Sequence, residues 1–202
     1  MNLLAHLHLS GDSDNIRIGN FIGDFVRGNP KGVFPPLVCK GILMHRMIDE
    51  YTDQHEIVRA SKSKLKGKYR HYSGVIVDIF YDHFLAVNWN TFSKQSLEEF
   101  TQECYSLLND HQEILPPKVN YMIKYMVKEN WLFNYRHLEG IGRSLFGMSR
   151  RTKFDSKMDQ AIKELELHYK DFQNEFLAFY PQLRQKADEF LEEVGGKKVG
   201  IR

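Results

Sequence analysis

The sequence predicts an all-α protein that folds as a single compact domain of about seven to ten helices. Apolar residues recur at helical spacing along most of the chain, whereas strand-like alternation is nearly absent. No internal repeat or low-complexity linker divides the 202 residues, and 42% of them are hydrophobic, which is enough for one core. We expect the domain to span residues 1–194, followed by a frayed tail over residues 195–202.

The composition excludes several classes of protein. Lys and Arg number 28 against 26 Asp and Glu, and a net charge of +2 argues against a whole surface built for nucleic acid. Cys39 and Cys104 lack C-x-x-C spacing, which excludes a disulfide scaffold and a cysteine zinc site. No segment resembles a signal peptide or the roughly 18 apolar residues of a membrane span. We therefore expect a cytoplasmic protein without membrane association.

The N-terminal part combines histidines with a carboxylate in an apolar stretch. His6 and His8 lie in MNLLAHLHLS, and Asp24 lies in GNFIGDFVRGNP. Arg27 follows Asp24 by three residues, so the simplest interpretation is an ion pair between them. A lone histidine is more often structural than a ligand. Several acidic and imidazole groups in three apolar segments of the first half of the chain nevertheless favour a shared site.

A helix predicted over residues 36–53 carries the second group. Gly41, His45 and Asp49 fall on one face because they are four residues apart. His45 and Asp49 could share a metal ion, or Asp49 could orient the imidazole. An ordinary ion pair between them is the alternative. We expect Gly41 to leave room on this face for a ligand.

A third helix, predicted over residues 75–89, has apolar residues around its whole circumference and should be buried. Asp78 and Asp82 are stacked one turn apart on it, with His83 alongside. Burying two carboxylates costs several kcal/mol unless they are protonated or meet a cation. Either a divalent metal or an arginine such as Arg46 could supply that charge.

Three later patterns complete the helical prediction. Ser96 and Glu99 form a capping box before an amphipathic helix, and Pro116 and Pro117 suit the start of another. A single apolar stripe then runs over residues 158–179, and Pro181 should end or kink that helix.

A basic run between Arg59 and Arg70 contains no acidic residue. We expect an acidic partner to bind five residues of this run: Lys62, Lys64, Lys66, Lys68 and Arg70. A solvated basic loop is the alternative. Arg143, Arg150 and Arg151 form a weaker second candidate.

The blocks HLHLS, GNFIGDFVRGNP, GILMHRMIDEYTDQH, YSGVIVDIFYDHFLAVNW and F-x-x-FYP, in this order, resemble the acyl carrier protein phosphodiesterase family. The resemblance runs from about Met1 to Leu183. It implies an all-helical fold of the HD-domain-like type. It also implies a phosphodiesterase that releases 4′-phosphopantetheine from the serine of holo acyl carrier protein with a divalent metal, notably Mn²⁺. Oxygen-rich ligation with some imidazole also suits Fe²⁺ or Mg²⁺.

The matching blocks imply the candidate metal ligands His6, Asp24, His45, Asp78, Asp82 and His83. Asp24 and Asp82 are the candidate catalytic residues, either of which could orient the attacking water. Arg27 and Arg46 are candidate phosphate clamps, with salt bridges as the alternative. Acyl carrier proteins are acidic, so the basic run is the expected docking surface. The chain departs from HD-type enzymes in having no His-Asp dipeptide.

Two other functions compete with this one. An HD-like phosphohydrolase could act on a nucleotide or another small phosphate ester, because a metal site does not itself define the group to which the phosphate is attached. A non-enzymatic helical module could use the basic run to bind nucleic acid or another acidic partner. The second is disfavoured because no known nucleic-acid motif accompanies the run.

Overall fold

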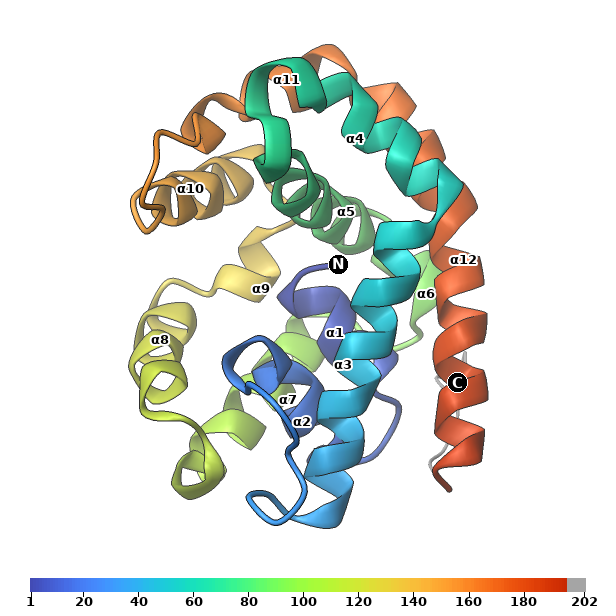
Figure 1. Ribbon diagram of the computed structural model, residues 1–202, viewed down its shortest axis with the longest axis vertical. Helices are drawn as coiled ribbons and strands as arrows, with labels where there is room; N and C mark the ends of the chain where they lie inside the picture. The colour runs from blue at the N-terminus through green and yellow to red at the C-terminus, as the bar shows by residue number, and fades with distance from the viewer. Residues whose placement is uncertain (196–202) are drawn as a thin grey trace.

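The computed structural model describes residues 1–195, and these residues fold into helices joined by short loops (Figure 1). The α-helices are α1 (Leu3–Leu9), α2 (Asp14–Ile22), α3 (Pro36–Gln54), α4 (Glu56–Tyr69), α5 (Ser73–Val87), α6 (Trp89–Phe92), α7 (Leu97–Asp110), α8 (Pro117–Lys128), α9 (Trp131–Asn134), α10 (Leu138–Ser149), α11 (Ile162–Leu167) and α12 (Tyr169–Glu193). Short 3-10 helices are η1 (Gly23–Phe25), η2 (Arg70–Tyr72), η3 (Gln112–Ile114) and η4 (Met158–Gln160).

The all-α prediction is confirmed. Within residues 1–195 no strand forms, and the one β-like feature is an isolated bridge between Lys31 and Phe34. No helix in this part of the chain is both long enough and apolar enough to cross a membrane. The tail predicted over residues 195–202 lies outside the described residues except for Gly195.

Helix α1 occupies the centre of the molecule, where it contacts α2, α5 and α12 (Figure 1). Leu4, Leu7 and Leu9 are fully buried, and so are most side chains of α5. The prediction that α5 is buried is therefore confirmed. A seven-residue helix is too short to be stable alone, so its position depends on these neighbours.

Helices α2 and α3 pack unusually closely because two glycines face each other. A Cβ atom on Gly19 would lie 2.1 Å from the Val38 carbonyl oxygen, and one on Gly41 would lie 2.2 Å from the Ile16 carbonyl oxygen. The expectation that Gly41 leaves room for a ligand is wrong, because the backbone of α2 fills that space. The close approach instead sets the position of α3 relative to α2.

The C-terminal part differs from the single long helix that the stripe predicts. The stripe over residues 158–179 is divided among η4, α11 and α12, with breaks at Ala161 and His168. Pro181 does not end a helix but lies inside α12, which continues to Glu193. The capping box of Ser96 and Glu99 is present as predicted.

Candidate metal centre and active site

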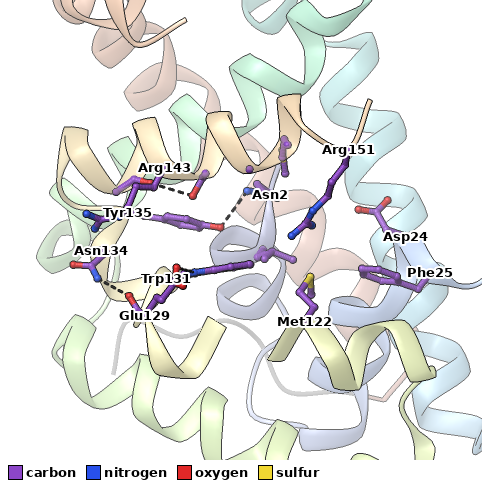
Figure 2. A pocket seen from close by; sticks show the side chains of 15 residues that line it. Asn2, Asp24, Phe25, Met122, Glu129, Trp131, Asn134, Tyr135, Arg143 and Arg151 are labelled. Atoms are coloured by element: carbon purple, nitrogen blue, oxygen red, sulfur yellow. Dashed lines mark hydrogen bonds between the residues drawn. The ribbon is translucent and has the colours of Figure 1, made fainter. Parts of the chain in front are cut away.

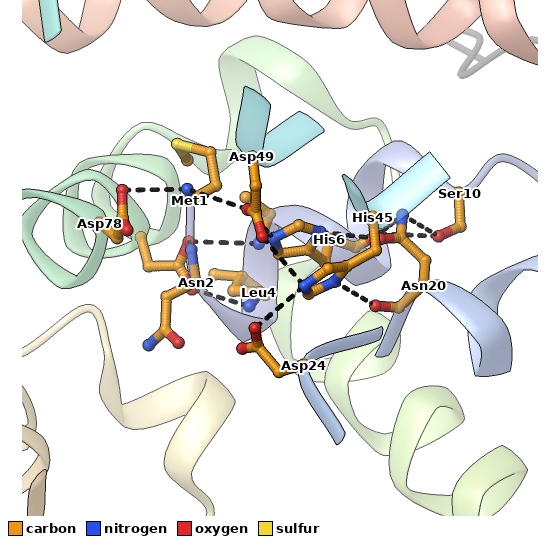
Figure 3. Close-up of polar contacts among 12 residues, drawn as sticks. Met1, Asn2, Leu4, His6, Ser10, Asn20, Asp24, His45, Asp49 and Asp78 are labelled. Atoms are coloured by element: carbon orange, nitrogen blue, oxygen red, sulfur yellow. Dashed lines mark hydrogen bonds and ion pairs between the residues drawn. The ribbon is translucent and has the colours of Figure 1, made fainter. Parts of the chain in front are cut away.

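Three side chains from two helices form the cluster at the centre of the site (Figure 3). His6 lies on α1, whereas His45 and Asp49 lie one turn apart on α3. Asp49 Oδ1 is 3.2 Å from His6 Nε2, and Asp49 Oδ2 is 3.1 Å from His45 Nε2. One potential ligand atom from each residue lies within 4.8 Å of the others, which is close enough for a single ion.

Asn20 determines which imidazole nitrogens face the cluster. Its amide nitrogen donates to the His6 carbonyl oxygen at 2.8 Å and to Ser10 Oγ at 3.0 Å, so its amide oxygen faces His6 Nδ1 at 2.7 Å. The Asn20 carbonyl oxygen lies 2.7 Å from His45 Nδ1. Both oxygens accept, so both Nδ1 atoms carry a hydrogen and donate. In each neutral ring this leaves the lone pair on Nε2, pointing toward Asp49.

The two Nε2 atoms are buried, and in the neutral rings no donor of the described residues reaches them, because the groups that they face are the carboxylates of Asp49 and Asp24. His6 and His45 are 3% and 5% exposed. Buried polar nitrogens without partners are costly, and two imidazole lone pairs directed at one carboxylate would be satisfied by a cation. The cluster is therefore compatible with a divalent metal ion.

Asp24 approaches the cluster from η1. Its Oδ1 atom is 3.3 Å from His45 Nε2, although its side chain is 72% exposed. Contact with His45 lowers the pKa of Asp24. Burial alone would lower the pKa of His45, but hydrogen bonding to Asp24 and Asp49 raises it to about 9. Gly23 permits this arrangement, because a Cβ atom there would lie 2.2 Å from the His45 ring.

Asp82 is fully buried and accepts three backbone N–H groups at the start of α1. The strongest contact is from Leu4 N at 2.7 Å, followed by Asn2 N and Ala5 N, both at 3.3 Å. Burial raises the pKa of Asp82 to about 7, against these hydrogen bonds. Asp82 therefore caps α1 from another helix and fixes the position of His6.

The other predicted ligands make different contacts and are not brought into the cluster. Asp78 Oδ1 accepts from the amino group of Met1 at 3.0 Å. That amino group also lies 3.9 Å from Asp49 Oδ1. His83 Nδ1 donates to the Tyr135 carbonyl oxygen at 2.7 Å, and its Nε2 lies 3.0 Å from the Tyr169 hydroxyl.

The two predicted phosphate clamps, Arg46 and Arg27, make different contacts near the site. Arg46 donates to the carbonyl oxygens of Val26 and Gly28 at 3.0 and 2.7 Å, so it holds the segment that follows η1. Arg27 is exposed and forms no ion pair with Asp24 within residues 1–195, so the simple pair expected from their spacing is absent.

A cavity of about 240 Å³ adjoins the cluster (Figure 2). Asp24 and Phe25 line it on one side, while α8, α9 and α10 supply most of the remaining wall. Asp24 both lines the cavity and contacts His45, so it connects the cavity with the cluster.

The basic run lies along α4 and η2, and three of its five predicted binding residues are paired with acids. Lys62 pairs with Asp53 at 2.6 Å, Lys64 with Glu175, and Lys68 with Glu164 at 3.1 Å. Lys66 and Arg70 are exposed, and neither forms an ion pair within the described part of the chain. These two are the charges most available to a partner.

Two residues of the cluster and its surroundings, Asp49 and Asn20, are not among the site residues that the resemblance implies. Asp49 is absent from the ligand set that the family resemblance implies, although its four-residue spacing from His45 indicates that the two could share a metal ion. Asn20 gave no signal, because its role depends on contacts with His6, Ser10 and His45 that only the folded chain creates.

Comparison with known proteins agrees with the resemblance. The family model described as acyl carrier protein phosphodiesterase matches residues 1–183. A protein of that name from Photorhabdus laumondii is 37% identical over 189 residues, covering 93% of this chain and 96% of its own. One from Serratia proteamaculans is 36% identical over 190 residues, covering 94% and 98%. No solved structure matches the chain significantly.

The fold and the site define an all-helical enzyme with a buried histidine and aspartate cluster beside a cavity, and its relatives place it among the phosphodiester hydrolases. The chain belongs to the acyl carrier protein phosphodiesterase family. The HD-domain-like part of the fold prediction stays a prediction.

Proposed function

We propose that this enzyme is a metal-dependent phosphodiesterase that hydrolyses holo acyl carrier protein to apo acyl carrier protein and 4′-phosphopantetheine. The observation that carries the proposal is the family match over residues 1–183, whose span includes both histidines with unpartnered Nε2 atoms. We propose Mn²⁺ as the ion, because two imidazole nitrogens and a carboxylate suit it better than Mg²⁺. Fe²⁺ has a similar preference.

His6, His45 and Asp49 would hold the ion, with Asp24 as a fourth ligand or as the base that orients water. Asp24 suits the second role better, because it is exposed to the cavity while the other three residues are more enclosed. When bound, the ion supplies Lewis-acid chemistry that activates water and draws charge from the phosphoryl oxygens. Asp82 acts as a positioning residue, because it anchors the helix that carries His6.

The docking surface would be the exposed part of the basic run. Lys66, Arg70 and Arg59 are exposed and carry the positive charge that an acidic carrier protein would meet. Lys62, Lys64 and Lys68 would contribute less, because nearby acids already offset their charge.

The reaction can be tested by intact-mass analysis of holo acyl carrier protein incubated with the enzyme. We expect loss of the phosphopantetheine mass with Mn²⁺ and no loss with a chelator. Asp24→Ala should abolish the reaction, whereas Asp110→Ala, at an exposed site at the end of α7, should not. Cleavage of nucleotides or other small phosphate esters, with none of carrier protein, would favour the phosphohydrolase alternative instead.

The metal centre can be tested separately by titrating the metal-free protein with Mn²⁺. His45→Asn should weaken binding by about a hundredfold or more, because one of three ligands is lost. His55→Asn is the matched control, because His55 lies at the end of the same helix, accepts from Ile57 N, and is replaced by a residue that can also cap α4. Equal affinity in the two variants would contradict the proposed ligand set.

A further inference from the structure

Charged side chains lie at both ends of the cavity beside Asp24 (Figure 2). Arg151 points into it at the end where Asp24 and Phe25 lie. Glu129 and Asn134 lie toward the opposite end, where Glu129 accepts from Trp131 Nε1 at 2.9 Å. Arg143 lines the cavity on the side of Asn134, so Arg151 is the arginine beside Asp24, whose Oδ1 atom lies 3.3 Å from His45 Nε2. A phosphate that lies next to the cluster would therefore meet Arg151.

The wall between these ends is largely apolar. Met122 from α8, Trp131 from α9 and Met148 from α10 line it, and polar groups such as Ser144 are interspersed. The volume of about 240 Å³ lies below the roughly 300 Å³ at which small-molecule pockets begin. The cavity thus suits part of a ligand, such as a narrow arm still attached at one end to a larger molecule.

Arg151 is better placed to hold a phosphate than the two arginines that the sequence favoured. Arg46 already donates to two backbone carbonyl oxygens, and Arg27 does not line the cavity. Arg151 lines it and forms no ion pair with an acidic residue in the described part of the chain. Its guanidinium can bind two phosphate oxygens at once.

We infer that this cavity receives the pantetheine arm of the substrate, with Arg151 binding the phosphate beside Asp24 and the apolar wall holding the alkyl part of the arm. The inference rests on the proposed function, because the arm is the group released there. It assigns the preference for a diester that carries the arm to the apolar wall, since a diester without the arm would lack those contacts, and it assigns binding of the phosphate to Arg151.

Binding of the free product tests the inference without turnover. We expect the full chain with Mn²⁺ to bind 4′-phosphopantetheine in a calorimetric titration. Arg151→Met should weaken this binding by roughly tenfold or more, because charge-assisted contacts to phosphate are lost, and should leave the binding of pantetheine unchanged. Arg150→Met is the matched control, because Arg150 is exposed, adjacent and outside the cavity wall.

Two glycines of α10 provide a second pair of variants. A Cβ atom at either Gly147 or Gly142 would meet no atom within 4 Å, but only Gly147 lines the cavity. Gly147→Leu should therefore fill the cavity and weaken binding of both pantetheine and 4′-phosphopantetheine. Gly142→Leu should bind both like the wild type, and thermal unfolding would show that both variants are folded.

The same variants separate this inference from the proposed function. We expect Arg151→Met and Gly147→Leu to lower kcat/KM for holo acyl carrier protein by about tenfold or more. Gly147→Leu should affect hydrolysis of bis(p-nitrophenyl) phosphate less, because that diester has no arm, whereas Arg151→Met should lower it too, because the phosphate is common to both substrates. If the wild type cleaves holo acyl carrier protein and the Arg151→Met and Gly147→Leu variants cleave it as well as their controls do, the inference is overturned and the proposed function stands. Absence of wild-type cleavage would overturn the proposed function, and absence of product binding would overturn the inference.

Discussion

His6 and His45 stack ring against ring, with their centroids 4.0 Å apart and their planes 20° from parallel. They come from different helices, and Asn20 on a third helix fixes both rings by accepting from each Nδ1. The stacking brings the two Nε2 atoms to the same carboxylate, Asp49. Burial and the charge of His45 lower the pKa of His6, whereas Asp24 and Asp49 raise the pKa of His45, so binding a metal through both Nε2 atoms would displace a proton from His45.

Asn20 should affect metal binding without being a ligand. Asn20→Ala would remove the acceptor that orients His6, so we expect Mn²⁺ affinity to fall by about 10- to 100-fold. The buried groups left without partners should also lower the free energy of unfolding by about 1–3 kcal/mol. Asn120→Ala, at a half-buried amide that donates to the Gln112 carbonyl oxygen, should reduce stability alone. Normal Mn²⁺ affinity in Asn20→Ala would contradict the orienting role.

Asp82 should be more important for the stability of α1 than its position on α5 suggests. Asp82→Ala would leave three backbone N–H groups without their acceptor, and we expect a loss on the order of 2 kcal/mol in urea unfolding. Asp82→Asn should lose less, because the amide oxygen can still accept. If the metal-free forms of both variants unfolded like the wild type, Asp82 would not be an anchor of α1.

His83 should make the protein sensitive to acid without contributing to metal binding. Burial lowers the pKa of His83, and the charge of nearby His137 acts in the same direction. His83 therefore binds a proton more readily in the unfolded chain, where its pKa is about 6.5, than in the folded protein. The stability contributed by neutral His83 is therefore full above that pH and lost as the pH falls toward the folded pKa.

Unfolding measured with a chelator between about pH 5 and 8 tests this, because the slope depends on the difference in bound protons. His83→Gln should show a smaller loss of stability on acidification than the wild type. His83→Gln should also retain its Mn²⁺ affinity. A large loss of affinity would instead support His83 as a ligand.

Charge reversal in the basic run should affect the protein substrate only. We expect Lys66→Glu combined with Arg70→Glu to raise the KM for holo acyl carrier protein by roughly tenfold at low ionic strength, and by less in high salt. Hydrolysis of bis(p-nitrophenyl) phosphate should be unchanged. Lys94→Glu, at an exposed site between α6 and α7, is the control. Equal loss on both substrates would indicate damage to the fold or the site rather than to docking.

Local patterns in the sequence predicted most of the helices. The capping box of Ser96 and Glu99 and the apolar residues on every side of the helix around Ile79 are local patterns, so they could be recognised without tertiary information. The break at His168 was missed because the apolar stripe continues through it at helical spacing.

Local sequence patterns account for most of the helices, the burial of α5 and the supply of imidazole and carboxylate groups. Which of those groups come together depends on how the helices pack. His6 joins His45 and Asp49 because Gly19 and Gly41 let α2 lie against α3 and because Asp82 anchors α1. Asp78 and His83 are instead engaged by Met1 and Tyr135. Helical periodicity specifies only neighbours on the same helix, whereas a site built from three helices depends on how closely their backbones pack.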